Sequence, residues 1–368
     1  MPAFAEELPL AGPYLLDPQP NSIVVQWETM AQTAESVVYQ GPDGKRRKVP
    51  GKFRPMGKLT KDVPGRMVRA ILTGLKACTE FQYRIEPGQK DGWQHTFMTP
   101  SPPGEICPGG LHVAFFGDTR WGTKEHTAVV RQLAGDKPQL VVNLGDIVSV
   151  ANRIHEWKSF FQIERELLGN TPMILVPGNH EGYLAKDFGR AMLSRFFGLP
   201  NKPAVGHRRI DYGVLRLLVL DVYWGESLAR GHEGWKWLEK ELAGTPANRV
   251  AVVFVHTPVY SFGRHGVYEN MKELRPLLAK HRVTAVIAGH HHGYEHFLVG
   301  GTHHLTLGGG GAPFHDPHMK PVPEEEHLLV SEGQFHHYLF LDISADDLRF
   351  RVRNTDVQKT HEEWQLKR

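Results

Sequence analysis

The chain has 368 residues, which is long for one domain, so we expect two domains. Hydrophobic residues make up 40% of the chain and charged residues 23%, as in a globular protein with ample material for a core. The net charge of +3 is too small to indicate a nucleic-acid partner. No stretch approaches the roughly 18 apolar residues of a membrane-spanning helix, so no membrane span is expected.

The two cysteines, Cys78 and Cys107, are too far apart for a Cys-x-x-Cys motif, which excludes a zinc ribbon and a thioredoxin-like redox motif. Two interpretations stay open: one disulfide near the domain junction, or two reduced buried thiols. The segment Ala3-Phe4-Ala5 is similar to the end of a signal-peptide cleavage site. It indicates an exported protein, periplasmic or secreted; otherwise the start is an unstructured segment of a cytoplasmic protein.

The N-terminal part has an all-β pattern after a loose start at residues 1–12. Between residues 13 and 103, apolar and polar residues alternate, for example from Ile23 to Glu28 and from Phe81 to Glu86. Turn sequences such as Pro87-Gly88 separate these short runs. We therefore predict a β-sandwich over residues 13–103. The proline-rich stretch Thr99 to Gly104 is the expected linker to a second domain over residues 104–368.

From Leu111 onward the pattern becomes α/β. Helical spacing predicts helices over Lys124 to Leu133, with Thr123 as the cap, and over Phe188 to Phe196 and Trp235 to Leu242. Apolar runs that favour buried strands lie between the helices. Further strands are predicted near residues 297–299, 304–307, 338–343 and 348–352. This order of elements favours two packed mixed β-sheets flanked by helices.

Five strand-like runs of this second domain end in residue types that bind metal ions. The residues at these ends are Asp118, Asp146, Asn179 followed by His180 and Glu181, His256, and the series His290, His291 and His292. Functional groups gather beyond the carboxyl ends of strands in α/β sheets, so we expect these ends to share one crevice. Each aspartate alone would be an ordinary strand-end turn residue, but five such endings in one chain indicate a metal centre.

The order Gly-Asp, Gly-Asp, Gly-Asn-His-Glu, Val-x-x-His, Gly-His-x-His resembles that of the calcineurin-like metallophosphoesterases, and within them the purple acid phosphatases. The resemblance covers Leu111 to about Arg353. The segment from Pro13 to Thr29 is also similar to the fibronectin-III-like domain that precedes the catalytic domain in plant-type purple acid phosphatases. The fold that this resemblance implies is the one that the pattern of elements favours.

The resemblance implies a site for two divalent or trivalent metal ions, with Fe, Zn or Mn as candidates. Asp146 corresponds to the bridging carboxylate. The first metal would also take Asp118 and His292, and the second would take Asn179, His256 and His290. His180 would be a proton donor to the leaving group, held by a carboxylate. His291 is expected to be structural.

Two positions depart from the family pattern. Purple acid phosphatases have an iron-binding tyrosine three residues after the second aspartate, where this chain has Ser149. We therefore expect no purple colour. Other metallophosphoesterases have Asp-x-His in the first block, where this chain has Arg120. The first metal thus lacks its usual fourth protein ligand. Water, Ser149 or His126 are the candidates to replace it, and the alternative is that this site binds its metal weakly.

Arg120, His126 and His265 are candidate substrate-binding residues. A guanidinium beside the metals can hold phosphate oxygens, although an ion pair with a carboxylate is the alternative for Arg120. His126 lies in the first turn of a predicted helix, where it is either a ligand or phosphate contact or an ordinary surface residue. His265 lies nine residues after His256, where purple acid phosphatases place substrate-contacting histidines.

The leading hypothesis is a binuclear phosphomonoesterase that hydrolyses small phosphate esters by in-line attack of a metal-activated hydroxide. One alternative is a phosphodiesterase acting on nucleotides or phospholipid head groups. The other is a non-catalytic binding protein with a degenerate metal site. The physiological substrate and the oligomeric state are not predicted.

Overall fold

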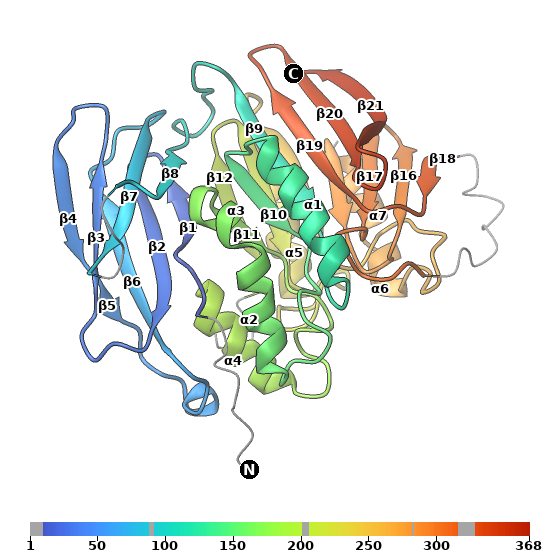
Figure 1. Cartoon of the computed structure of the whole chain (residues 1–368). Helices are drawn as coiled ribbons and strands as arrows, with labels where there is room; N and C mark the ends of the chain where they lie inside the picture. The colour runs from blue at the N-terminus through green and yellow to red at the C-terminus, as the bar shows by residue number, and fades with distance from the viewer. Residues whose placement is uncertain (1–9, 88–91, 201–205, 282, 316–327) are drawn as a thin grey trace.

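The computed structural model describes residues 10–87, 92–200, 206–281, 283–315 and 328–368, which form two regions side by side (Figure 1). Most of the predicted loose start, residues 1–9, lies outside these ranges. None of the helices in the described ranges combines the length and the apolar character that crossing a bilayer requires.

The N-terminal region is the predicted β-sandwich, made of two four-stranded antiparallel sheets. One sheet has the order β1-β2-β6-β5 and the other β4-β3-β7-β8. Alternate residues such as Val25, Trp27 and Tyr83 fill the core between the sheets. The strands are β1 (Tyr14–Gln19), β2 (Ser22–Thr29), β3 (Ser36–Gln40), β4 (Arg46–Pro50), β5 (Lys52–Phe53), β6 (Arg66–Thr73), β7 (Glu80–Glu86) and β8 (His95–Met98), with a 3-10 helix η1 (Lys58–Thr60).

The second region has the two packed mixed sheets that the sequence predicts (Figure 1). The six-stranded sheet has the order β11-β10-β9-β19-β20-β21 and the seven-stranded sheet β12-β13-β14-β15-β17-β16-β18. One apolar core lies between them and takes side chains from both, including Phe115 and Phe254. The strands are β9 (Leu111–Phe116), β10 (Leu140–Asn143), β11 (Met173–Leu175), β12 (Arg208–Tyr212), β13 (Leu215–Leu220), β14 (Val250–Val255), β15 (Ala285–Ala288), β16 (Tyr294–Val299), β17 (Thr302–Leu307), β18 (Leu329–Gly333), β19 (His337–Ile343), β20 (Asp347–Asn354) and β21 (Lys359–Lys367).

Helices cover the outer faces of both sheets, each with its own apolar core. The predicted helices are confirmed, although Thr123 is the first residue of α1 rather than its cap, and no side chain caps that helix. The helices are α1 (Thr123–Gly135), α2 (Ile154–Ile163), α3 (Arg165–Asn170) and α4 (Lys186–Phe197) beside the six-stranded sheet, and α5 (Glu233–Ala243), α6 (Glu269–Lys272) and α7 (Arg275–Lys280) beside the seven-stranded sheet.

The two regions are joined by buried polar contacts and by a disulfide. The outer face of β2 packs against α2 and α4, so Gln26 and Glu28 are buried although they alternate with core residues. Glu28 accepts hydrogen bonds from Lys158 and, at 2.9 Å, from Nη2 of Arg195. Cys78 and Cys107 form a disulfide, which decides between the two interpretations of the cysteines.

Candidate metal centre

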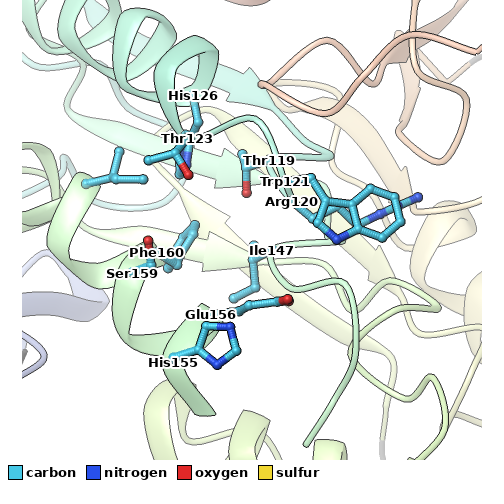
Figure 2. A pocket seen from close by; sticks show the side chains of 11 residues that line it. Thr119, Arg120, Trp121, Thr123, His126, Ile147, His155, Glu156, Ser159 and Phe160 are labelled. Carbon is cyan, nitrogen blue, oxygen red and sulfur yellow. The ribbon is translucent and has the colours of Figure 1, made fainter. Parts of the chain in front are cut away.

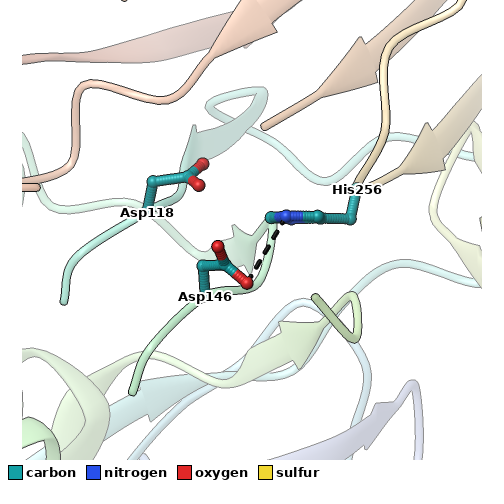
Figure 3. A group of neighbouring side chains, drawn as sticks. All are labelled: Asp118, Asp146 and His256. Atoms are coloured by element: carbon teal, nitrogen blue, oxygen red, sulfur yellow. Dashed lines mark ion pairs between the residues drawn. The ribbon is translucent and has the colours of Figure 1, made fainter. Parts of the chain in front are cut away.

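The residues that follow β9, β10, β11, β14 and β15 lie close together, at the carboxyl ends of these strands. Asp118 and Asp146 follow β9 and β10, and His256 follows β14 directly. One ligand atom from each of these three buried residues lies within 4.8 Å of the others (Figure 3). Asp118, Asp146 and His290 have φ angles of 58°, 56° and 69°, a left-handed conformation that is uncommon for residues with a side chain. Such strain persists where the surroundings hold it, often at functional sites.

Both carboxylates are fully buried, and one oxygen of Asp118 lacks a hydrogen-bond donor. Oδ2 of Asp118 accepts the backbone N–H of His290 at 2.9 Å, while its Oδ1 has no hydrogen-bond donor among the described residues. A Cβ atom at Gly289 would lie 2.4 Å from this carboxylate, so glycine is required there. Oδ1 of Asp146 accepts the backbone N–H of His180 at 2.9 Å. A buried carboxylate oxygen without a donor fits a site for a cation.

The proposed second-metal ligands face one another across a short gap. Oδ1 of Asn179 lies 3.1 Å from Nε2 of His256 and 3.1 Å from Nδ1 of His290. Nε2 of His256 is also 3.4 Å from Oδ1 of Asp146. His256 donates its Nδ1 proton to the carbonyl of Leu144 at 2.7 Å, which leaves Nε2 toward the gap. One carboxylate, one amide oxygen and two imidazoles suit Zn, Fe or Mn.

Charge and burial shift the pKa values of these groups in opposite directions. Burial raises the pKa of Asp118 to about 7. Burial would also raise the pKa of Asp146, but the nearby His256, His180 and Arg120 hold it below its usual value. Burial alone would lower the pKa of His256, but the carboxylate of Asp146 raises it to about 9. A metal at Nε2 of His256 therefore has to displace a proton.

Arg120 lies among the proposed ligands of the first metal. Its Nε donates to Oδ2 of Asp146 at 3.2 Å, and its Nη2 lies 3.0 Å from Nε2 of His292. His292 donates its Nδ1 proton to the carbonyl of Pro313, so its Nε2 accepts from the guanidinium. The Arg120 side chain is buried, with an exposed fraction of 7%. The ion pair that the sequence analysis gave as an alternative is therefore present, and its partner is the proposed bridging carboxylate.

His180 lies beside Asp146 with one ring nitrogen directed at the site. Its Nδ1 donates to the carbonyl of Ser149 at 2.6 Å, so the expectation that a carboxylate holds this ring is wrong. The carbonyl that fills this role belongs to the loop after β10. The Nε2 atom is 3.9 Å from Oδ2 of Asp146. Burial lowers the pKa of His180, although the charge of Asp146 opposes this.

Glu181 holds the two main loops of the site together, a role that the sequence did not reveal. Its buried carboxylate accepts backbone N–H groups of Gly178 at 2.7 Å, Ile147 at 2.7 Å and Asp146 at 3.1 Å. Burial raises its pKa to about 7. The loop after β11 is thereby fixed to the loop after β10, which sets the position of Asn179 relative to Asp146.

Both side-chain candidates for the missing fourth ligand of the first metal form hydrogen bonds with carboxylates instead. The hydroxyl of Ser149 donates to Glu156 at 2.6 Å. Nε2 of His126 lies 2.8 Å from Oε1 of Glu164, and both side chains are buried. His126 is thus not a surface residue, because it is buried and its Nε2 faces Glu164; its role as a ligand or phosphate contact stays a prediction.

A cavity of about 260 Å3 lies beside the centre, between the loop after β9 and helices α1 and α2 (Figure 2). Arg120, Trp121, His126 and Glu156 are among its lining residues. Trp121 is 59% exposed, and its ring lies 4.4 Å from the guanidinium carbon of Arg120. Its φ of 68° and its exposure identify it as a functional candidate that sequence reasoning missed.

His265 lies at the other side of the centre, beside the second-metal ligands. Its ring centroid is 4.8 Å from that of His290 and 5.0 Å from that of His315. His291 is buried between neighbouring turns, and a Cβ atom at Gly263 would lie 2.1 Å from its ring. These positions are compatible with a substrate contact for His265 and a structural role for His291, which both stay predictions.

A family model described as calcineurin-like phosphoesterase matches residues 111–294, which is half of the chain. The chain belongs to the calcineurin-like phosphoesterase family. A second model, the N-terminal domain of purple acid phosphatases, matches residues 14–99. This phosphoesterase therefore pairs the two domains found in purple acid phosphatases, as the motif order indicates.

Comparisons with individual proteins agree with this assignment. The chain is 24% identical over 297 residues to Fe(3+)-Zn(2+) purple acid phosphatase 12 of Arabidopsis thaliana, covering 75% of this chain and 62% of that protein. It is 24% identical over 346 residues to probable inactive purple acid phosphatase 9 of the same plant, covering 74% and 52%. The phosphoesterase thus spans less than two thirds of the length of these two relatives.

A solved structure shows the same fold over nearly the whole chain. Purple acid phosphatase PPD1 from seeds of yellow lupin, Lupinus luteus, superposes with a TM-score of 0.79 at 18% identity, covering 98% of this phosphoesterase and 74% of that chain. This likeness confirms the sandwich followed by two packed sheets.

Proposed function

We propose that this phosphoesterase is a metal-dependent phosphomonoesterase that acts on small phosphate esters. The observation that supports this most is the convergence of Asp118, Asp146 and His256 from three strand ends, with Asn179 and His290 closing the same gap. A cation bound there would polarise the phosphoryl oxygens and lower the pKa of a water molecule for in-line attack. The donor set suits Fe, Zn or Mn, and Asp146 would be the carboxylate that holds the metal beside Asn179, His256 and His290.

The residues around the gap have separate roles in this proposal. His180 has its Nδ1 proton fixed on the carbonyl of Ser149, so its Nε2 is the atom that would give a proton to the leaving oxygen. Arg120 would bind phosphate oxygens with the guanidinium N–H groups that do not already donate to Asp146 and His292. Its charge favours a monoester, which carries one negative charge more than a diester. Trp121 would cover the leaving group from the side of the cavity.

The choice between ester classes is tested by comparing p-nitrophenyl phosphate with bis(p-nitrophenyl) phosphate after loading with Mn, Zn or Fe salts. We expect the monoester to give the higher kcat/KM. A clear preference for the bis ester would replace the proposal with a phosphodiesterase. Less than one bound transition metal per chain, with no turnover of either ester, would favour the binding protein instead.

The role of His180 predicts both a pH limb and a leaving-group dependence. A proton donor must be protonated, and burial lowers its pKa, so kcat should fall as the pH rises through a value below 6.5. In a His180→Asn variant this limb should disappear. Its kcat should fall about 100-fold for phenyl phosphate, whose leaving group needs a proton. The loss should be smaller for p-nitrophenyl phosphate, and an equal loss for both esters would argue against proton donation.

We also propose that the protein is exported, to a periplasm or outside the cell, rather than cytoplasmic. The support is the Cys78–Cys107 disulfide, because such bonds persist mainly in oxidising compartments. Thiol labelling of protein taken from its native source tests this. Two free thiols in the native protein would favour the cytoplasmic alternative.

A further inference from the structure

We infer that the guanidinium of Arg120 takes the place of the first metal, so that the centre binds one cation, at Asp146, Asn179, His256 and His290. This inference deepens the proposed function and rests on it only for the identity of the reaction. Where a binuclear centre has two metal charges, this one would combine a metal with a permanently charged side chain.

The contacts of Arg120 are those that the first metal would need. Two of the three ligands assigned to that metal, Asp146 and His292, present their free side-chain atoms to the guanidinium at 3.2 and 3.0 Å. His292 cannot turn its other nitrogen to a metal, because Nδ1 donates to the carbonyl of Pro313 at 2.6 Å. A cation that bound these same atoms would have to displace the arginine from both.

The arginine is also held in place by its surroundings. Its backbone N–H donates to the carbonyl of Asp146 at 3.3 Å, and its guanidinium lies against the ring of Trp121. The side chain is buried next to two buried carboxylates, Asp118 and Asp146. An arginine pushed out of this position by a metal would lose these charge-assisted contacts, and a second metal would have to replace all of them.

Both side-chain candidates for the fourth ligand of the first metal, Ser149 and His126, are already paired with carboxylates. The tyrosine of purple acid phosphatases is replaced by Ser149, whose hydroxyl donates to Glu156. The histidine of other metallophosphoesterases is replaced by Arg120 itself, and His126 is paired with Glu164. Of the residues that the family resemblance assigns to it, the first site would therefore keep Asp118, a shared Asp146 and His292.

The second site has the opposite character. Its donor atoms on Asn179, His256 and His290 converge at 3.1 Å, and no described lysine or arginine contacts any of the three side chains. Oxygen and nitrogen acceptors held this close require a cation or a proton between them. The second site is thus open to an exchangeable metal cation, whereas the first site already contains the fixed positive charge of Arg120.

The experiment is metal counting on the whole protein equilibrated with Mn2+, followed by EPR. We expect one Mn2+ per chain with the six-line spectrum of an isolated ion. In an Arg120→His variant, which restores Asp-x-His, we expect two Mn2+ per chain and an exchange-coupled spectrum, since paired ions lie about 3.5–4 Å apart. Arg120→Gln is the matched control: it removes the charge without adding a ligand, and we expect its second ion to bind at least 10-fold more weakly than in Arg120→His.

A second pair of variants keeps the test decisive if Arg120→His does not fold. His292→Ala should keep one Mn2+ per chain, while His256→Ala should lose it. Wild-type protein with two coupled Mn2+ ions, or with none, would overturn the inference. One bound Mn2+ without ester hydrolysis would support the inference and contradict the proposed function. Two bound Mn2+ with ester hydrolysis would support the proposed function and contradict the inference.

Discussion

An Asp146→Ala variant is expected to lose more than about 1,000-fold in kcat/KM for p-nitrophenyl phosphate, because losing a single stabilising donor already costs about 100–1,000-fold. Asp146 is the residue that contacts His256, Arg120 and the backbone of His180, so its loss removes a ligand and disorders the surrounding donors. Bound metal should fall in parallel by more than the roughly 10–100-fold that indirect metal contacts contribute. Steady-state kinetics and metal analysis measure the two effects.

Asp342 provides the matched control for this variant. It is a partly buried carboxylate of the same domain that pairs with Arg351 and His112, away from the centre. Asp342→Ala should keep metal content and activity while changing stability. Full hydrolytic activity in Asp146→Ala would contradict the site as a whole, since no other described carboxylate contacts both His256 and Arg120.

A Glu28→Gln variant is expected to lower the free energy of unfolding by about 3–5 kcal/mol, the cost of removing one partner from a buried ion pair. Lys158 and Arg195 would both keep a buried charge without its carboxylate. Because the three residues lie between the sandwich and the second region, the sandwich should also loosen from that region. Urea unfolding followed by fluorescence measures the change in stability, and a second unfolding transition would report the separation of the two domains.

The exposed pair of Glu233 and Lys236 on α5 is the control for Glu28. These side chains are 71% and 60% exposed and 2.7 Å apart. Glu233→Gln should change the stability by less than about 0.5 kcal/mol, because solvent screens exposed pairs. A Glu28→Gln variant that unfolds at the same urea concentration as Glu233→Gln would show that the interface does not depend on this carboxylate.

Sequence patterns predicted the parts of this molecule that depend on local chemistry. Apolar runs and the residues after them located five strand ends, and parallel strands bring such ends to one edge within each of the two sheets. The predicted fold class is confirmed by the sheets and by the lupin enzyme. The residue roles at the centre and the division near residue 104 stay predictions.

The contacts that decide the character of the site could not be predicted. Nothing near Arg120 in the sequence shows that its guanidinium lies between Asp146 and His292, which is 172 residues away along the chain. Glu181 looked like part of a row of ligands, but its carboxylate binds three backbone N–H groups. The pairing of His126 with Glu164 likewise depends on how α1 packs on the next helices.

The disulfide spans the linker, with Cys78 before it and Cys107 after it. A protease that cuts the chain once between residues 99 and 104 would therefore not release the sandwich. The cut protein would run as one band on a non-reducing gel and as two after reduction. A nick in the linker would thus leave the two halves covalently attached.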